Sequence, residues 1–136
     1  MAMIGKKVLV VDDDPDMLDA ISMILEAQGY QVVIAHDGME CLDKLSAQKP
    51  DLMILDLLMP NMDGFAVYKE LQSPKWSEYR DMPILILSSV REEASRRRYE
   101  LETGQELKPD EYIEKPILPG VLLNCVEKLL KRKQQV

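Results

Sequence analysis

The 136-residue chain has the length of one domain, and with 46% hydrophobic and 30% charged residues it can bury a core and remain soluble. Its 24 acidic and 17 basic residues give a net charge of −7, which argues against direct nucleic-acid binding, because phosphate contacts need clustered Lys and Arg. No apolar run approaches the roughly 18 residues of a membrane span and no secretory signal is visible, so we expect a cytoplasmic protein without membrane insertion.

The chain begins with a β-branched run that predicts a buried strand over 6–11. Asp14 and Pro15 follow it and suit the N-cap and the first residue of a helix. The apolar face of this helix, which ends near Gly29, consists of Met17, Leu18, Ile21, Ile24 and Leu25. A second strand over 31–35 and a turn at 36–38 lead into a short second helix. Its apolar positions are Met39, Leu42 and Leu45.

The third strand is an apolar run over 52–59 with one carboxylate, Asp56, set in it. A short run without polar alternation predicts a strand that is buried on both faces. Turn residues at 60–64 end the run, so Asp56 lies where a central strand ends, and a lone buried carboxylate is costly unless it is paired or functional. A third helix then begins at Gly64 or the next residue. Its inward positions are Phe65, Tyr68 and Leu71.

Residues 73–82 predict a loop, in which Trp76 serves as a packing anchor away from the strand ends. A fourth buried strand over 83–87 leads to Ser88 and Ser89. The helix predicted over 91–103 has a thin apolar stripe, so we expect it to dock weakly. The stripe consists of Val90, Ala94 and Leu101. The adjacent Arg96, Arg97 and Arg98 are interpreted as a solvated face, with a docking patch for an acidic partner as the alternative.

A loop over 104–110 precedes a short fifth strand over 111–114 and a final amphipathic helix. The apolar positions of that helix are Val121, Leu122, Cys125, Val126, Leu129 and Leu130. Cys41 and Cys125 both lie in helical apolar patterns and are expected to be free thiols of a reduced compartment. Five strand–helix units in succession predict an α/β fold, a doubly wound parallel sheet with helices on both faces. We expect one domain over 4–133, with no output domain after it.

The polar residues that follow the strands are predicted to meet at one edge of the sheet, because sites in open parallel sheets form beyond the carboxyl ends of the strands. These residues are Asp12, Asp13 and Asp14 after the first strand, Asp56 at the third, Ser88 and Ser89 at the fourth, and Lys115 at the fifth. Converging carboxylates repel one another unless a hard divalent cation such as Mg²⁺ joins them. A lysine and a hydroxyl beside the metal suit a phosphoryl group, so the inferred chemistry is phosphoryl transfer onto a carboxylate.

Two nearby polar residues have more ordinary interpretations. Asp14 could be a third metal ligand, but the helix that follows it favours the N-cap. His36 could relay a phosphoryl group, but it follows a strand expected at the edge of the sheet, and a surface turn residue is the favoured interpretation.

The same residues resemble the receiver domain of two-component response regulators, over essentially the whole chain and in the same order. Four motifs carry the resemblance: Val11-Asp12-Asp13-Asp14-Pro15, Asp56-Leu57-Leu58-Met59-Pro60-Asn61-Met62-Asp63-Gly64, Leu87-Ser88-Ser89 and Tyr112-Ile113-Glu114-Lys115-Pro116. The resemblance implies a flavodoxin-like fold with five helices and a five-stranded sheet in the order 2-1-3-4-5. It also implies a cis peptide bond before Pro116.

The resemblance also implies a role for each site residue. Asp56 is the phosphoacceptor, phosphorylated by a histidine kinase or a histidine phosphotransfer protein. Mg²⁺ is held by Asp12, Asp13, Asp56 and the backbone carbonyl of Leu58. Lys115 contacts the phosphoryl group, Ser88 is the switch hydroxyl, and Tyr112 is the aromatic residue whose rotamer follows the switch.

The chain departs from the family pattern in a few places. Ser88 replaces the commoner threonine and keeps the hydroxyl, and Ser89 takes a place that is usually small and apolar. The segment 96–110 is longer than usual, which affects the boundaries of the fourth helix and fifth strand but not the site. Leu58 and Val90 occupy two places that help to set the lifetime of the phosphate. Both are apolar and have no group to orient a water molecule, so we expect a longer phosphoryl lifetime than with polar residues there.

The function predicted from the sequence is a phosphorylation-dependent signalling switch that contacts a downstream protein through the fourth helix, fifth strand and fifth helix. As an enzyme it would catalyse only its own phosphorylation and dephosphorylation. One alternative is a Mg²⁺-dependent phosphohydrolase with an aspartyl-phosphate intermediate, similar to the haloacid dehalogenase group. Such enzymes need a second carboxylate two residues after the nucleophile, where this chain has Leu58. The other alternative is a receiver-like scaffold that is never phosphorylated.

Overall fold

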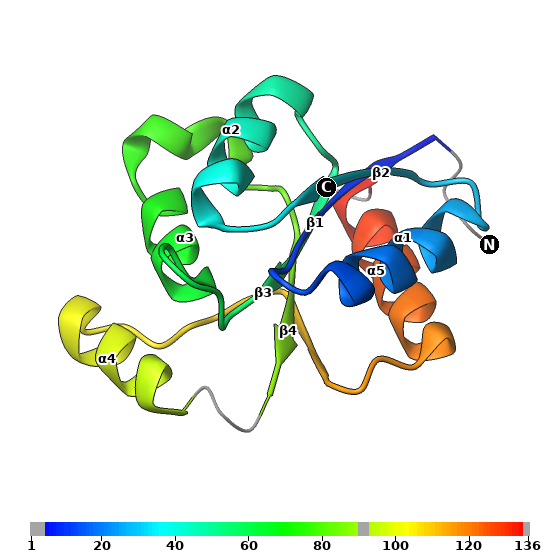
Figure 1. Cartoon of the computed structure of the whole chain (residues 1–136). Coiled ribbons are helices and arrows are strands. Elements are labelled where there is room, and N and C mark those ends of the chain that lie inside the picture. Colours follow the sequence, from blue (N-terminus) through cyan, green and yellow to red (C-terminus); the bar gives the residue numbers. More distant parts are fainter. Residues whose placement is uncertain (1–4, 90–92, 135–136) are drawn as a thin grey trace.

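The computed structural model describes residues 5–89 and 93–134, which form a parallel five-stranded sheet covered by helices on both faces (Figure 1). The strands are β1 (Lys7–Val11), β2 (Gln31–Ala35), β3 (Leu52–Asp56), β4 (Ile84–Ser88) and β5 (Glu111–Glu114). Their order in the sheet is β2-β1-β3-β4-β5, and each neighbouring pair is parallel. The doubly wound flavodoxin-like fold and the strand order predicted from the sequence are therefore confirmed.

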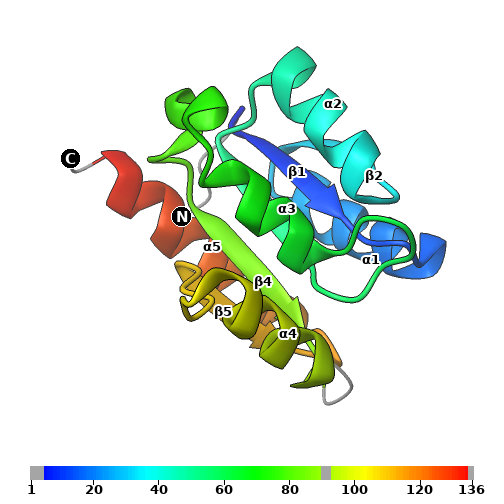
Figure 2. The ribbon, with the colours of Figure 1, turned by 90° about the vertical axis from the view of Figure 1, so that its left-hand side faces the viewer.

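The helices divide between the two faces of the sheet (Figures 1 and 2). On one face lie α1 (Pro15–Glu26) and α5 (Pro119–Gln134), and on the other lie α2 (Gly38–Gln48), α3 (Gly64–Leu71) and α4 (Glu93–Thr103). A 3-10 helix, η1 (Pro74–Tyr79), stands within the segment predicted to be a loop. The Ser73 side chain caps its first turn, and the Trp76 indole donates a hydrogen bond to Glu70 from a buried position, as expected for a packing anchor.

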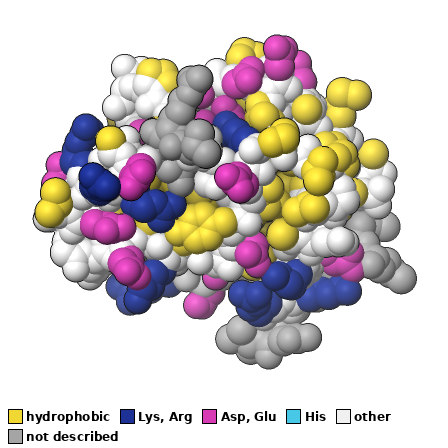
Figure 3. Space-filling model, turned by 90° about the horizontal axis from the view of Figure 1, so that it is seen from below, with side chains coloured by type: hydrophobic (Ala, Val, Ile, Leu, Met, Phe, Trp, Pro, Cys, Tyr) yellow, Lys and Arg dark blue, Asp and Glu magenta, His cyan; other side chains and the backbone are white. Residues whose placement is uncertain are grey.

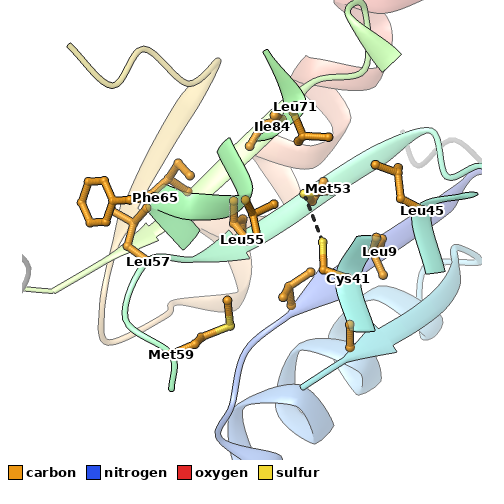
Figure 4. Close-up of a cluster of buried hydrophobic side chains, with 14 of the residues drawn as sticks. Leu9, Cys41, Leu45, Met53, Leu55, Leu57, Met59, Phe65, Leu71 and Ile84 are labelled. Atoms are coloured by element: carbon orange, nitrogen blue, oxygen red, sulfur yellow. Dashed lines mark hydrogen bonds between the residues drawn. The ribbon is translucent and has the colours of Figure 1, made fainter. Parts of the chain in front are cut away.

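The central strands are buried on both faces, because side chains that alternate along them enter two separate cores. Leu9, Met53 and Leu55 pack toward α2 and α3 in the cluster of Figure 4, whereas Val10 and Ile54 pack toward α1 and α5. Every residue of β3 is buried, Asp56 included. This double burial explains why β1 and β3 contain unbroken apolar runs in the sequence.

The turn after β3 holds the N-terminus of α3 against the end of that strand. Asp63 caps the helix by accepting a hydrogen bond from the amide of Ala66, and the amide of Gly64 donates to the carbonyl of Leu57. A Cβ atom at Gly64 would overlap the backbone of Asp56 and Leu57, so only glycine permits this close approach. The start of the third helix is thus Gly64, the first of the two predicted positions.

Helix α4 packs through a residue that the predicted apolar stripe omitted. Ala94 is exposed and Leu101 is 86% exposed, so two members of the stripe were wrong, and Val90 lies outside the described residues. Among the described residues of α4, Tyr99 is the buried one. Its ring centroid lies 5.8 Å from that of Phe65 and 6.1 Å from that of Tyr68, both on α3. The burial of Tyr99 depends on these two residues of α3, which the sequence of α4 alone does not reveal.

Smaller differences concern other helical positions. Met39 is 60% exposed on α2, where Cys41 is buried instead, and Val121 is 45% exposed on α5. Arg97 and Arg98 are exposed, as expected of a solvated face, but Arg96 is partly buried. The two cysteines are free thiols as predicted, and burial raises the pKa of Cys41 to about 12. Among the described residues, none of the helices combines the length and the hydrophobicity that crossing a membrane requires.

Replacing Tyr99 with alanine is expected to detach α4 from α3, since this side chain supplies the buried contact of the helix. Removing a buried aromatic ring should lower the free energy of unfolding by about 3–5 kcal/mol and speed amide exchange through α4. Urea denaturation and hydrogen exchange measure the two effects. The matched control is Leu101→Ala on the same helix, which should leave both unchanged. Equal effects of the two variants would contradict this account of how α4 docks.

Candidate functional site

The carboxyl ends of β1, β3 and β5 bring Asp12, Asp56 and Lys115 together at one edge of the sheet, although β4 lies between β3 and β5. Val11 pairs with Leu55 in the β1–β3 register, so Asp12 and Asp56 are the next residues on adjacent strands. Both are almost completely buried, with exposures of 0% and 5%. The strand order that places these residues side by side also leaves His36, after the edge strand β2, away from them. The predicted meeting of polar residues at this edge is thus observed for Asp12, Asp56 and Lys115.

Asp13 completes an acidic cluster with these two aspartates. One carboxylate oxygen from each of Asp12, Asp13 and Asp56 can be chosen so that all three lie within 4.8 Å of one another. Asp13 is exposed, so one side of the cluster is open to solvent. Three hard oxygen donors that are close enough to share one cation fit Mg²⁺, which retains several water molecules and accepts phosphate oxygens as further ligands.

Lys115 bridges the two buried carboxylates. Its Nζ atom lies 3.3 Å from Oδ2 of Asp12 and 3.3 Å from Oδ1 of Asp56. Burial acts to lower the pKa of Lys115, but the charges of Asp56 and Asp12 outweigh it and raise the pKa above the ordinary value. The side chain is 25% exposed, so the ammonium group faces both the aspartates and the solvent. The Lys115–Pro116 peptide bond is cis, as the family resemblance implied.

Asp56 is a carboxylate of the site whose pKa is shifted from its ordinary value. Burial and then the charge of Asp12 raise its pKa to about 7, although Lys115 and the backbone amide of Leu58 act to lower it. The carboxylate is thus held in an environment with too little positive charge to stabilise its ionised form fully. A divalent cation beside Asp12 and Asp13 would supply that charge.

The remaining predicted site residues lie beside this cluster. Ser88 is the last residue of β4, directly after Leu87, which pairs with Asp56 in the β3–β4 register. Its own carbonyl accepts a hydrogen bond of 2.9 Å from the amide of Lys115. Leu58 is half-buried two residues after Asp56, and the metal contact assigned to its carbonyl stays a prediction. Ser88 thus lies one residue beyond the position opposite Asp56 on the neighbouring strand, and Leu58 lies two residues after Asp56 on its own chain segment.

Asp14 and His36 have the ordinary roles favoured by the sequence. Asp14 caps α1 by accepting a hydrogen bond from the amide of Asp16, and Asp14 is exposed. His36 pairs with Glu40 at 3.1 Å in an exposed position at the edge of the sheet.

Tyr112 points outward from β5, with 39% of its surface exposed. Its hydroxyl donates a hydrogen bond to the carbonyl of Leu107 and accepts one from the guanidinium of Arg96. The sequence indicated Tyr112 as a switch residue but gave no sign of these two partners. Arg96 stood in a run of three arginines, and Leu107 stood in a segment predicted to be a loop.

Comparisons with known proteins agree with the family resemblance seen in the sequence. The sequence model of the response regulator receiver domain matches residues 8–127 of this chain. The alkaline phosphatase synthesis transcriptional regulatory protein PhoP of Bacillus subtilis is 37% identical over 130 residues, which are 96% of this chain and 50% of that protein. Response regulator MprA of Mycobacterium tuberculosis is 36% identical over 126 residues, 93% of this chain and 51% of that protein. The chain therefore spans about half the length of these curated relatives.

Solved structures show the same likeness. A putative response regulator from Chloroflexus aurantiacus superposes with a TM-score of 0.76 at 29% identity, covering 94% of this chain and 99% of that one. The signal receiver domain of a signal transduction histidine kinase from Syntrophus aciditrophicus superposes with a TM-score of 0.78 at 32% identity, covering 94% of this chain and 92% of that one.

Proposed function

This chain belongs to the response regulator receiver domains, and on that premise we propose that it is a phosphorylation-dependent switch whose phosphoacceptor is Asp56. The observation that carries the proposal is the arrangement of the buried Asp56, the ammonium group of Lys115 at 3.3 Å, and the acidic pair Asp12 and Asp13. A carboxylate so placed can act as a nucleophile toward phosphorus while its neighbours neutralise the incoming charge.

In the proposed reaction a carboxylate oxygen of Asp56 attacks the phosphorus of a phosphohistidine on a histidine kinase or a histidine phosphotransfer protein. A P–O bond forms, the P–N bond breaks, and the electron pair returns to the imidazole, which takes up a proton. Lys115 donates hydrogen bonds to the phosphoryl oxygens, and the hydroxyl of Ser88 moves toward them. Asp12, Asp13, Asp56 and the carbonyl of Leu58 would hold Mg²⁺, which neutralises negative charge when bound.

The response to phosphorylation is proposed to be a population shift of β4, α4 and Tyr112. The downstream protein would bind the surface made by α4, β5 and α5. Exposed apolar residues on these three elements and on the connection before α5 are Leu101, Tyr112, Leu118 and Val121. Figure 3 views the molecule from this side, where hydrophobic side chains gather between groups of basic ones. Such a mixture is typical of surfaces that contact other proteins.

The compartment, the extent of the domain and its role in signalling are also proposed. The free thiols favour the cytoplasm. The domain is proposed to cover 4–133, which contains the family match, and to act in signalling, with no chemistry beyond its own phosphorylation and dephosphorylation.

Incubation of the protein with Mg²⁺ and a small phosphodonor such as acetyl phosphate tests this function against its two alternatives. A lasting covalent phosphoryl group supports the switch. Continuous release of inorganic phosphate at a steady rate would instead indicate a phosphohydrolase, although Leu58 stands where such an enzyme needs its second carboxylate. Absence of labelling would indicate an unphosphorylated scaffold.

Replacing Leu58 with asparagine is expected to shorten the lifetime of the phosphoryl group, because an amide can orient a water molecule for attack on phosphorus and the leucine side chain cannot. The rate of loss of phosphate after removal of the phosphodonor measures this. Leu118→Asn, the same change at a 61% exposed leucine, is the control and should leave the rate unchanged. Equal rates in Leu58→Asn and wild type would refute the explanation. The second predicted position, Val90, lies outside the described residues.

A further inference from the structure

Two contacts hold the side chain of Tyr112 in its outward position. The phenol donates a hydrogen bond of 3.1 Å to the carbonyl of Leu107. The guanidinium of Arg96 donates to the phenol oxygen at 3.3 Å, and its central carbon lies 5.5 Å from the centre of the ring. The hydroxyl therefore has both a donor and an acceptor as neighbours, and a cation covers the ring. Two hydrogen bonds and a cation–π contact are more protein contacts than an exposed tyrosine needs, because water can satisfy its hydroxyl group.

We propose that Arg96 and the carbonyl of Leu107 form a latch that keeps Tyr112 outward and thereby holds this chain in its unphosphorylated conformation. The inference rests on the proposed function, in which Tyr112 follows the phosphorylation of Asp56, and it assigns the residues that oppose that movement. An inward turn of the ring must break the hydrogen bond to Leu107 and uncover the guanidinium of Arg96. The latch thus sets the ratio of inactive to active conformations before phosphorylation.

The carbonyl side of the latch is firmly anchored. Leu107 is 4% exposed and belongs to the core on the α3 side of the sheet. The next carbonyl, of Lys108, accepts a hydrogen bond of 2.9 Å from the hydroxyl of Tyr68 on α3. At the end of the same segment, a carboxylate oxygen of Asp110 accepts a hydrogen bond from the amide of Ile84. The long connection between α4 and β5 is therefore a fixed support for Tyr112.

The cation side of the latch belongs to a helix with few buried contacts. Arg96 belongs to α4, whose buried contact with the rest of the described chain is Tyr99 against Phe65 and Tyr68. When Tyr112 leaves Arg96, α4 loses a tie to β5 and keeps the aromatic contact with α3. The rotamer of one tyrosine is in this way linked to the position of a helix on the proposed docking surface. The latch thus joins a carbonyl on the well-anchored connection between α4 and β5 to a guanidinium on α4, whose buried described residue is Tyr99.

The Arg96→Met variant tests the latch, because methionine keeps an unbranched apolar side chain but removes the charge and the donors. Its effect is measured by NMR on unphosphorylated protein with ¹³C-labelled tyrosine rings, the Tyr112 signals being assigned with Tyr112→Phe. Cross-peaks from the ring to Leu107 report the outward rotamer, and cross-peaks to Ser88 report the inward one. We expect the inward-to-outward ratio to rise about three- to ten-fold, as loss of one cation–π contact and one hydrogen bond implies.

Arg97→Met is the matched control, since Arg97 is the next residue of the same helix, carries the same charge and pairs with the exposed Glu93. It should leave the ratio at the wild-type value. Arg96→Lys retains the charge without the planar donor group and should give an intermediate ratio, and it serves as the test if Arg96→Met does not fold by circular dichroism. A wild-type ratio in the folded Arg96 variants overturns the latch. Because the measurement uses unphosphorylated protein, this outcome is distinct from a failure of Asp56 to accept phosphate.

The same variants also test the regulatory consequence. If the latch opposes activation, Arg96→Met should be phosphorylated by acetyl phosphate several-fold faster than Arg97→Met at equal Mg²⁺ concentration. A shift of the Tyr112 rotamer without any change in phosphorylation rate would overturn the claim that the latch restrains the switch.

Discussion

Asparagine at position 56 is expected to abolish covalent phosphorylation by acetyl phosphate in the presence of Mg²⁺. The amide has nearly the shape of the carboxylate and can still accept the hydrogen bond from the amide of Leu58, but it lacks the negatively charged oxygen that attacks phosphorus. Labelling should fall from nearly one phosphoryl group per chain to background. Intact-protein mass spectrometry measures the covalent product directly.

The control for this variant is Asp43→Asn, which makes the same chemical change at an exposed aspartate of α2, outside the acidic cluster. This control should be labelled like the wild type. Persistent labelling of Asp56→Asn would show that another side chain is the phosphoacceptor. Loss of labelling in Asp43→Asn would show that the assay responds to a general loss of negative charge.

The same Asp56→Asn variant is expected to be more stable than the wild type at pH 8 when divalent cations are removed with a chelator. Burial and the charge of Asp12 raise the pKa of Asp56 from 3.8 to about 7 in the folded protein. Between these two values the folded state binds a proton that the unfolded chain has lost, so Asp56 lowers the wild-type stability as the pH rises through this range. The variant should gain on the order of 4 kcal/mol at pH 8 relative to its difference from wild type at pH 4, because each pKa unit corresponds to about 1.4 kcal/mol.

Urea denaturation of both proteins between pH 4 and pH 8 provides the measurement. The difference in unfolding free energy should grow with pH from about 4 to 7 and level off above. Adding Mg²⁺ at pH 8 should stabilise the wild type more than the variant, because the variant has lost one of three clustered carboxylates. A stability difference that does not change with pH would contradict the raised pKa of Asp56 and its electrostatic origin.

The fold and the main part of the site could be predicted from the sequence. The fold follows from the pattern of buried strands, and the site follows from the polar residues at their carboxyl ends. An apolar run interrupted by Asp56 indicated a strand buried on both faces, and β3 is such a strand. In a parallel sheet the residues that follow the strands meet at one edge, so Asp12, Asp56 and Lys115 could be grouped before any geometry was known. The observed distances of 3.3 Å from Lys115 to both aspartates agree with that grouping.

The features that the sequence did not reveal depend on contacts between side chains that are distant along the chain. Tyr99 is buried because two aromatic residues of α3 face it, and the sequence of α4 by itself does not show which neighbours its residues meet. Arg96 looked like its two neighbours until the fold placed Tyr112 beneath it. The 3-10 helix at Pro74–Tyr79 is too short for a periodic signal, and its backbone is kinked at the buried Trp76.

Locating the phosphoryl group tests the central claim most directly. After incubation with Mg²⁺ and acetyl phosphate, borohydride reduction of the acyl phosphate and peptide mass spectrometry identify the modified residue. The account predicts modification of Asp56 alone, with none in the Asp56→Asn variant. Modification of a different residue, or release of inorganic phosphate without any covalent product, would contradict it.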